Sequence, residues 1–149
     1  MVTLNVPRDF KEFLKSLNDH RVEYLLIGGY AVGYHGYPRA TADMDIWIAV
    51  NQQNAYNLVA ALQDFGFNTA ELSPELFLRE GQIVRMGVQP MRIEIMTSVT
   101  GVNFEECYKT RVVDELDGVA TNIIDLDHLK INKNALGRYK DLADVENLP

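Results

Sequence analysis

Residues 112–123 carry the pattern that most restricts the possible folds. Two stretches rich in β-forming residues, Val112–Leu116 and Val119–Ile123, flank the dipeptide Asp117-Gly118. An Asp-Gly pair between two such stretches favours a tight hairpin, because both residues tolerate the positive φ that the turn requires. The pattern therefore predicts at least one antiparallel pair of strands.

Helical patterns accompany this hairpin. At 52–65 apolar residues recur at helical spacing, and Gly66 follows as a C-terminal cap. A first helix is expected after Asp9, which stands in the N-cap position, with Glu12 three residues later in the capping-box position.

The rest of the chain alternates between short helices and short strands. Asp125 is expected to cap a helix that extends to about Leu136 and is closed by Gly137. Shorter helices are expected at 30–35, 104–108 and 140–148. Strands are expected at 24–27, 44–50, 83–88 and 91–96, with a turn at Gln89-Pro90 between the last two. Residues 68–82 indicate a loop with at most one helical turn.

This mixture of helices, strands and a hairpin predicts an α+β fold, or a mixed-sheet α/β fold. The length of 149 residues and the 47% hydrophobic content favour one domain over residues 1–149. There is no apolar run of about 18 residues and no basic start followed by an apolar stretch, so neither a transmembrane helix nor a secretory signal is expected. The single cysteine, Cys107, rules out an internal disulfide and favours a cytoplasmic location.

Two aspartates open the strand expected at 44–50. Asp43 and Asp45 are two positions apart, so their side chains point to the same face, about 7 Å apart along the chain. Like charges at this spacing are stabilised by a cation between them, and Mg²⁺ typically takes one or two carboxylates together with substrate phosphates. Taken alone, the pair also fits two solvated carboxylates at the start of a strand.

Three other features point in the same direction. Gly28-Gly29 separates a strand from a helix, where glycine lets the backbone approach a phosphate, although a simple tight turn also needs it. Glu94 lies in an apolar strand, where a carboxylate needs a partner, a metal or an exposed edge. Lys133 falls on the apolar stripe of its helix, so it either extends to solvent or meets negative charge.

Together, these features resemble the nucleotidyltransferase superfamily of the polymerase-β type. Its signature is an apolar residue and Gly-Gly or Gly-Ser, then about nine to thirteen residues, then Asp-apolar-Asp/Glu, with a third acid on a neighbouring strand. The stretch GGYAVGYHGYPRATADMDIWI and the tail LKINKNALGRYKDLADVENL are similar to the small bacterial branch of that superfamily. Many small members carry Asp as the third acid, whereas this chain carries Glu94.

The resemblance implies a nucleotidyltransferase fold, with one mixed β-sheet, helices mainly on one face and a C-terminal helical pair. It also implies catalysis with two Mg²⁺ ions, or Mn²⁺, held by Asp43, Asp45 and Glu94. Glu94 would also accept the proton of the attacking hydroxyl. Gly28, Gly29 and Lys133 would bind the NTP.

Other polar residues near these motifs have weaker assignments. Arg39 and Thr41 precede the aspartates and are candidates for nucleotide binding, although a role in anchoring its loop is favoured for Arg39. His35 is expected to make a helix-end or loop contact rather than to act as a ligand. Arg138 and Asp141 are expected to form a structural ion pair between the last two helices.

Three readings of the function remain open. The first is an enzyme that transfers NMP to an acceptor hydroxyl. The resemblance favours RNA or protein as the acceptor, as in toxin–antitoxin members of the family, and a small molecule such as an antibiotic is the alternative. The net charge of −7 argues mildly against a long RNA. The second is a non-catalytic nucleotide-binding or antitoxin-like protein. The third is an α/β protein whose acids are surface features.

Overall fold

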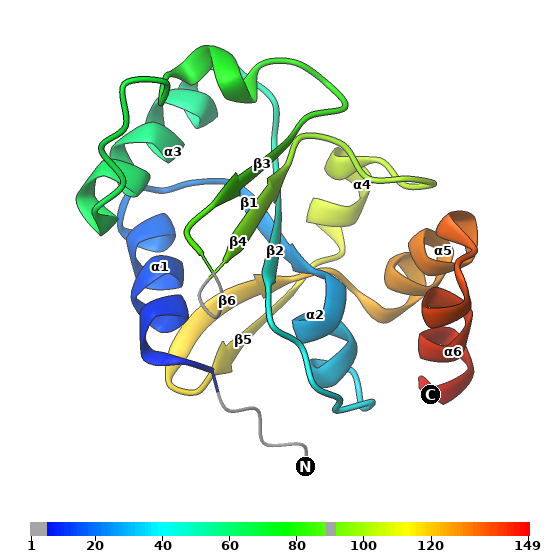
Figure 1. Cartoon of the computed structure of the whole chain (residues 1–149). Coiled ribbons are helices and arrows are strands. Elements are labelled where there is room, and N and C mark those ends of the chain that lie inside the picture. Colours follow the sequence, from blue (N-terminus) through cyan, green and yellow to red (C-terminus); the bar gives the residue numbers. More distant parts are fainter. Residues whose placement is uncertain (1–5, 89–91) are drawn as a thin grey trace.

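The computed structural model describes residues 6–88 and 92–149 (Figure 1). Its strands are β1 (Tyr24–Ile27), β2 (Met44–Ile48), β3 (Ile83–Met86), β4 (Ile93–Met96), β5 (Val112–Leu116) and β6 (Val119–Ile123). Its helices are α1 (Arg8–Asp19), α2 (Gly28–Tyr34), α3 (Gln52–Phe65), α4 (Phe104–Lys109), α5 (Leu126–Leu136) and α6 (Tyr139–Asn147), with a 3₁₀ turn η1 (Pro74–Phe77).

The six strands form one mixed sheet in the order β3-β4-β2-β1-β6-β5. The pairs β1–β6 and β2–β4 are parallel, whereas β1–β2, β3–β4 and β5–β6 are antiparallel. This arrangement confirms the predicted α+β class with a mixed sheet. The predicted hairpin is confirmed as the pair β5–β6, with positive φ at both Asp117 and Gly118.

The two longest helices, α1 and α3, pack together on one side of the sheet, whereas α4, α5 and α6 lie on the other (Figure 1). Phe13 of α1 meets Phe65 of α3 edge to face, with ring centroids 5.4 Å apart. The predicted C-terminal pair α5–α6 is present, on the same side of the sheet as α4. Helices thus cover both sides of the sheet, whereas they were expected mainly on one face.

Three predicted helix-end signals are confirmed, at Gly66, Asp125 and Gly137. Asn51 caps α3 by accepting a hydrogen bond from the Asn54 N–H, and Gly66 ends the helix with a φ of 122°. Asp125 caps α5 through the His128 N–H, and Gly137 ends it in the left-handed region.

The predicted cap of the first helix is wrong. The N-cap of α1 is Pro7, which makes no side-chain cap hydrogen bond, so Asp9 lies inside the first turn. The helix starts earlier because the Pro7 carbonyl already accepts a hydrogen bond from the Lys11 N–H. Glu12 pairs instead with Arg8, one turn before it.

Other boundaries differ by a few residues. The helix expected at 30–35 starts earlier, at Gly28, and the strands expected at 44–50 and 83–88 end at Ile48 and Met86. The strand expected at 91–96 begins at Ile93, and the predicted turn at Gln89-Pro90 lies outside the described residues. Within the described ranges, no helix combines the length and apolar character that crossing a bilayer requires.

Candidate functional site

The centre of the candidate site is the parallel pair of β2 and β4. In their register Asp45 lies directly opposite Glu94, so both side chains point to one face of the sheet. Asp43 lies in the bend directly before β2, close enough for its charge to raise the pKa of Asp45. The structure thus brings the three predicted acids close together at the start of β2.

Asp45 is in an unfavourable environment for a negative charge. Burial, and then the charges of Glu94 and Asp43, raise the pKa of Asp45 to about 7. Its Oδ1 atom is buried and has no hydrogen-bond partner among residues 6–88 and 92–149. A buried carboxylate oxygen without a partner is costly, and a cation is the partner that its neighbours' charges favour.

Two arginines balance the other two acids. Nη2 of Arg92 lies 2.8 Å from Oδ2 of Asp43, and Nε of Arg85 lies 2.8 Å from Oε1 of Glu94. In the conformation described, no three carboxylate, histidine or cysteine side chains of the described residues converge on one point. A shared cation therefore requires Asp43 and Glu94 to turn away from their arginines.

The chemistry of this donor set fits a hard divalent cation. All three groups are carboxylates, which are the ligands that Mg²⁺ and Mn²⁺ prefer. Within the described residues Asp45 has a buried oxygen without a hydrogen-bond partner, Glu94 lies opposite it, and the charge of Asp43 acts on it. The residues present would thus hold a metal, with Asp45 at the centre.

The predicted Gly-Gly turn lies directly against the acids. Gly28 follows β1 with a φ of 67°, and a Cβ atom placed there would lie 2.2 Å from Oδ2 of Asp45. A Cβ atom at Gly29 would lie 2.4 Å from Oγ1 of Thr41 and 3.4 Å from Nη1 of Arg39. Only glycine permits this approach, so the turn brings the backbone, the acids and the predicted nucleotide-binding residues together.

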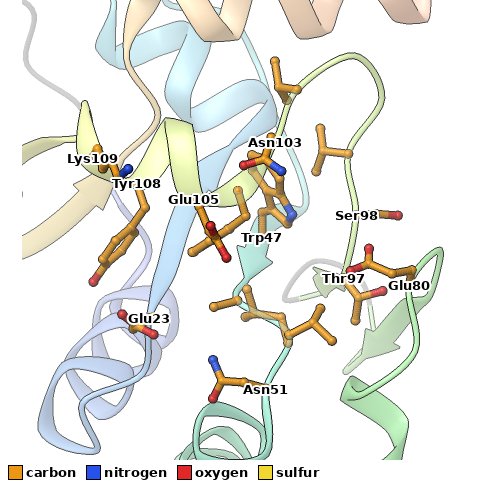
Figure 2. Close-up of a pocket in the computed structure, with 16 residues that line it drawn as sticks. Glu23, Trp47, Asn51, Glu80, Thr97, Ser98, Asn103, Glu105, Tyr108 and Lys109 are labelled. Carbon is orange, nitrogen blue, oxygen red and sulfur yellow. The ribbon is translucent and has the colours of Figure 1, made fainter.

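A cavity lies on the same side of the sheet, farther along β2 (Figure 2). Its walls come from α4 and from the segments that follow β2 and β4. Trp47, the next residue of β2 on the face of Asp45, is part of its lining. The sequence did not reveal this cavity, because residues far apart in the chain form it.

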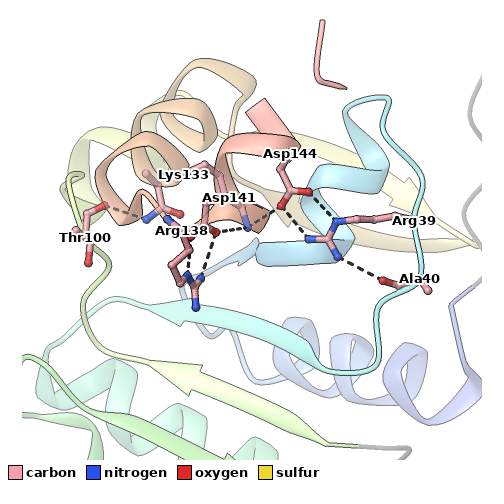
Figure 3. A network of polar contacts seen from close by, with 8 residues as sticks. Arg39, Ala40, Thr100, Lys133, Arg138, Asp141 and Asp144 are labelled. Atoms are coloured by element: carbon pink, nitrogen blue, oxygen red, sulfur yellow. Dashed lines mark hydrogen bonds and ion pairs between the residues drawn. The ribbon is translucent and has the colours of Figure 1, made fainter. Parts of the chain in front are cut away.

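Lys133 and Arg39 belong to a network of ion pairs with α6 (Figure 3). Nζ of Lys133 is 3.4 Å from Oδ1 of Asp141 and 3.2 Å from Oδ2 of Asp144, and the lysine is only 5% exposed. Arg39 places Nε and Nη2 on the two oxygens of Asp144, at 2.8 and 2.9 Å. Lys133 therefore meets negative charge rather than solvent, and Arg39 does anchor its loop.

The carboxylates of this network are held ionised. Burial alone would raise the pKa of Asp141, but hydrogen bonds from Arg138 and the charge of Lys133 outweigh it and lower the pKa. The pKa of Asp144 is lowered in the same way, against burial, by Arg39 and Lys133. Arg138 and Asp141 also form the predicted structural ion pair, at 2.6 Å.

Sequence reasoning missed Asp144 as the link between Arg39 and Lys133. Its signal was present, because Asp141, Asp144 and Leu148 recur on one buried face of the last helix and its C-cap. His35 makes the expected loop contact, with its Nε2 2.7 Å from the carbonyl of Ile124.

A family profile and solved structures place the chain among known proteins. A profile of the aminoglycoside-2''-adenylyltransferase family matches residues 9–128, a span that contains the Gly-Gly turn and all three acids but ends before Lys133. No curated protein matches the sequence.

Two solved structures share the fold. One is from Thermotoga maritima and is assigned to the nucleotidyltransferases, with a TM-score of 0.66, 15% identity and coverage of 97% of this chain and 94% of that one. The other is an antigenic nucleotidyltransferase-like protein from Paracoccidioides brasiliensis, with a TM-score of 0.56, 16% identity and coverage of 92% and 72%. The family match covers most of the chain, and the fold agrees with it. The chain belongs to the aminoglycoside-2''-adenylyltransferase family, within the nucleotidyltransferase superfamily.

Proposed function

We propose that this protein is a metal-dependent nucleotidyltransferase that moves NMP from an NTP to an acceptor hydroxyl. The observation that carries the proposal is the position of Asp45, opposite Glu94, with a buried oxygen that lacks a partner among the described residues. A non-catalytic nucleotide-binding or antitoxin-like protein has no need for this costly arrangement, and neither does a surface cluster of acids.

In the proposed reaction the acceptor oxygen attacks the α-phosphorus of the NTP. A new P–O bond forms, the bond to the β-phosphate oxygen breaks, and pyrophosphate leaves with the bonding electrons. Glu94 accepts the hydroxyl proton, since it lies opposite Asp45 in the register of β2 and β4 and is partly exposed. When bound, one or two Mg²⁺ or Mn²⁺ ions supply charge neutralisation for the triphosphate and lower the pKa of the hydroxyl.

The chain itself positions the donor. Asp43, Asp45 and Glu94 hold the metal, and the backbone at Gly28 and Gly29 approaches the phosphates without side-chain obstruction.

Three further residues are assigned to the nucleotide side of the site. Arg39 and Thr41 lie against Gly29. The positive charge of Lys133 acts on Asp45, where it opposes the increase in pKa. Arg39 and Lys133 thus place positive charge beside the proposed triphosphate site while Asp144 keeps them fixed in position.

For the acceptor, the family description favours a small molecule over RNA or protein. It names an aminoglycoside that is modified at its 2'' position. The net charge of −7 also disfavours long RNA. The sequence also predicts a partner in a toxin–antitoxin pair and a location in the cytoplasm, and both stay predictions.

Labelled transfer tests this function. Each α-³²P-labelled NTP is incubated with the protein, Mg²⁺, and either an aminoglycoside with a free 2''-hydroxyl, total RNA or cell extract. The proposal expects label on the aminoglycoside with at least one NTP, and none with EDTA or with the double variant Asp43→Ala/Asp45→Ala. If only RNA or protein is labelled, the acceptor is RNA or protein and not an aminoglycoside. If no NTP gives a labelled product although the protein binds nucleotide, the proposed enzymatic activity is wrong.

A further inference from the structure

Arg85, Glu94 and Asp45 form one row across three neighbouring strands. Arg85 of β3 pairs with Glu94 of β4, and Glu94 pairs with Asp45 of β2, so the three side chains point to one face of the sheet. Nε of Arg85 donates a hydrogen bond of 2.8 Å to Oε1 of Glu94. Because β3 is at one edge of the sheet and the Arg85 side chain is 59% exposed, this ion pair can be reached from solvent.

Arg92 forms a second ion pair, with Asp43. Its Nε and Nη2 atoms both donate to Oδ2 of Asp43, at 3.2 and 2.8 Å. The Arg92 carbonyl also accepts a hydrogen bond from the Met44 N–H, which fixes the Arg92 backbone beside the acids. The hydrogen bond to Asp43, and then the charges of the three acids, raise the pKa of Arg92. Its side chain, which is 35% exposed, is therefore close to all three acids and open to solvent.

These two ion pairs compete with a metal. Oδ2 of Asp43 and Oε1 of Glu94 already accept hydrogen bonds, and within the described ranges no three acidic side chains converge on one point. The two guanidiniums balance two of the three carboxylate charges, so the arginines take the place that a cation would have. Each carboxylate that turns toward a metal leaves a guanidinium without its present partner.

A released guanidinium would stay beside the acids. Arg85 is fixed in β3 and Arg92 directly before β4, so neither side chain can move away by more than its own length. An unpaired guanidinium attracts an anion from solvent, and phosphate suits its fork of N–H donors as a carboxylate does. The anion that the proposed reaction brings to this place is a triphosphate.

Arg39 is a fixed arginine and provides a contrast. It donates to both oxygens of Asp144, whose side chain is only 3% exposed and is no candidate for a metal ligand. A metal at Asp45 would leave this pair intact. Arg85 and Arg92 differ from Arg39 because each is held by an acid that the metal itself requires.

We propose that Arg85 and Arg92 exchange partners when the metal and the NTP bind together. Without nucleotide they neutralise Glu94 and Asp43. When the NTP binds with its metal, the two arginines release these acids and donate to phosphate oxygens of the NTP instead. The exchange rests on the proposed function, because it concerns the same metal site and the same triphosphate.

The exchange couples metal binding to nucleotide binding. In the absence of phosphate each arginine opposes the metal, because it has to give up its acid without a new partner. With phosphate present the arginine gains a partner and favours the complex. By linkage, the metal and the triphosphate should therefore each strengthen the binding of the other.

Two affinities measure this coupling. Binding of Mn²⁺ alone is followed by the electron paramagnetic resonance signal of the free ion, and binding of Mn²⁺–tripolyphosphate by calorimetry. Tripolyphosphate carries the phosphates of an NTP without a base, so the result does not depend on NTP preference. Arg85→Gln and Arg92→Gln should each bind Mn²⁺ alone roughly fivefold more tightly than the wild type, and Mn²⁺–tripolyphosphate roughly tenfold more weakly.

Arg8→Gln is the matched control. Nε of Arg8 lies 3.2 Å from Oε1 of Glu12, so this variant also removes an arginine from an ion pair, but on α1 and away from the site. It should change neither affinity. If both Arg85→Gln and Arg92→Gln bind Mn²⁺ alone as the wild type does, or more weakly, the exchange is wrong.

NMR of the arginine Nε–H groups separates an exchange of partners from a general effect of charge. The signals are identified by their loss in Arg85→Lys and Arg92→Lys. Saturating Mg²⁺ alone should broaden both signals, because released N–H groups exchange with water, and added tripolyphosphate should restore them at new positions. The Arg39 signal should persist throughout, since Asp144 holds this side chain. Signals of Arg85 and Arg92 that keep their metal-free positions under both conditions overturn the exchange.

The exchange and the transfer reaction fail in different ways. If the Arg85 and Arg92 signals respond as expected but no NTP gives a labelled product, the exchange stands and the transfer reaction falls. If product is formed and the two signals do not respond, the reaction stands and the exchange is wrong. If the wild type binds Mn²⁺ neither alone nor with tripolyphosphate, both the metal site and the exchange are wrong.

Discussion

Asp45 and Glu94 face each other across the parallel strands β2 and β4, and this pairing dominates the electrostatics of the site. Glu94 contributes the largest Coulombic increase to the pKa of Asp45, second only to burial. Arg85 and Arg92 balance Glu94 and Asp43, but one oxygen of Asp45 finds no hydrogen-bond partner in the described part of the chain. The environment of Asp45 thus destabilises the folded protein locally, at the position where the proposed chemistry needs a cation.

Replacing Asp45 with Asn is expected to stabilise the protein at neutral and alkaline pH. The pKa of Asp45 is about 7 in the folded protein and near 3.8 ordinarily, so the folded state binds more protons between these values. Wild-type stability should therefore fall as pH rises from about 4 to 7, and Asp45→Asn should remove that fall.

Thermal melts from pH 4 to 9 measure this effect. The variant should match the wild type near pH 4 and exceed it by on the order of 2 kcal/mol at pH 8, a shift of several degrees in Tm. Asp19→Asn, at the exposed aspartate that ends α1, serves as the control for loss of one charge. A constant difference between Asp45→Asn and wild type across this pH range contradicts the assignment.

Lys133→Met is expected to destabilise the fold by about 3 kcal/mol, because it leaves Asp141 and Asp144 buried with less positive charge. Lys140→Met, at an exposed lysine of α6, should change stability by less than about 0.5 kcal/mol. Urea unfolding followed by circular dichroism compares the two variants. Equal stabilities would show that the ion-pair network contributes little to the fold.

Gly28→Ala tests the close approach of the turn to Asp45. An added Cβ atom has to displace the Asp45 carboxylate and also adopts an unfavourable positive φ. Gly118→Ala shares the positive φ but meets no atom within 4 Å, so it isolates the backbone strain.

We expect Gly118→Ala to cost about 1 kcal/mol of stability and to leave transfer unchanged. Gly28→Ala should also lower the transfer rate at least about a hundredfold, because Asp45 is misplaced. Similar transfer rates for both variants would exclude Asp45 from the reaction.

Cys107 should be unreactive in the folded protein. It is fully buried, and burial followed by the charges of Asp125 and Glu106 raises the pKa of its thiol to about 11. Little thiolate is then present at pH 8. The Cys107 thiol should react slowly with a disulfide reagent in native buffer. In urea the reaction should be complete as soon as the protein unfolds. Rapid labelling of the native protein would contradict the burial of Cys107.

Local signals predicted much of this architecture. The Asp117-Gly118 turn, the cap at Asp125 and the glycine after α3 each act within a few residues, so their positions could be read directly from the chain. The predicted start of the first helix was wrong because Pro7 is its N-cap and α1 begins at Arg8, before Asp9. Here backbone geometry, rather than a side-chain cap, sets the boundary.

The site was predictable only in part, for a physical reason. Period-two alternation placed Asp43 and Asp45 on one face, but the register that sets Glu94 opposite Asp45 depends on pairing between distant strands. The same holds for Arg85 and Arg92 beside the acids, for Asp144 between Arg39 and Lys133, and for the cavity beneath α4. Long-range packing creates these contacts, and no local pattern encodes them.

The most direct test of the central claim is the dependence of transfer on metal in the wild type and in Asp45→Asn. Transfer from an α-³²P-labelled NTP is followed as Mg²⁺ or Mn²⁺ is raised from zero. We predict a saturable rise in the wild type and, in Asp45→Asn, a loss of at least about a thousandfold with the fold intact. Equal transfer by both proteins, or transfer by the wild type in excess EDTA, would contradict a metal site at Asp43, Asp45 and Glu94.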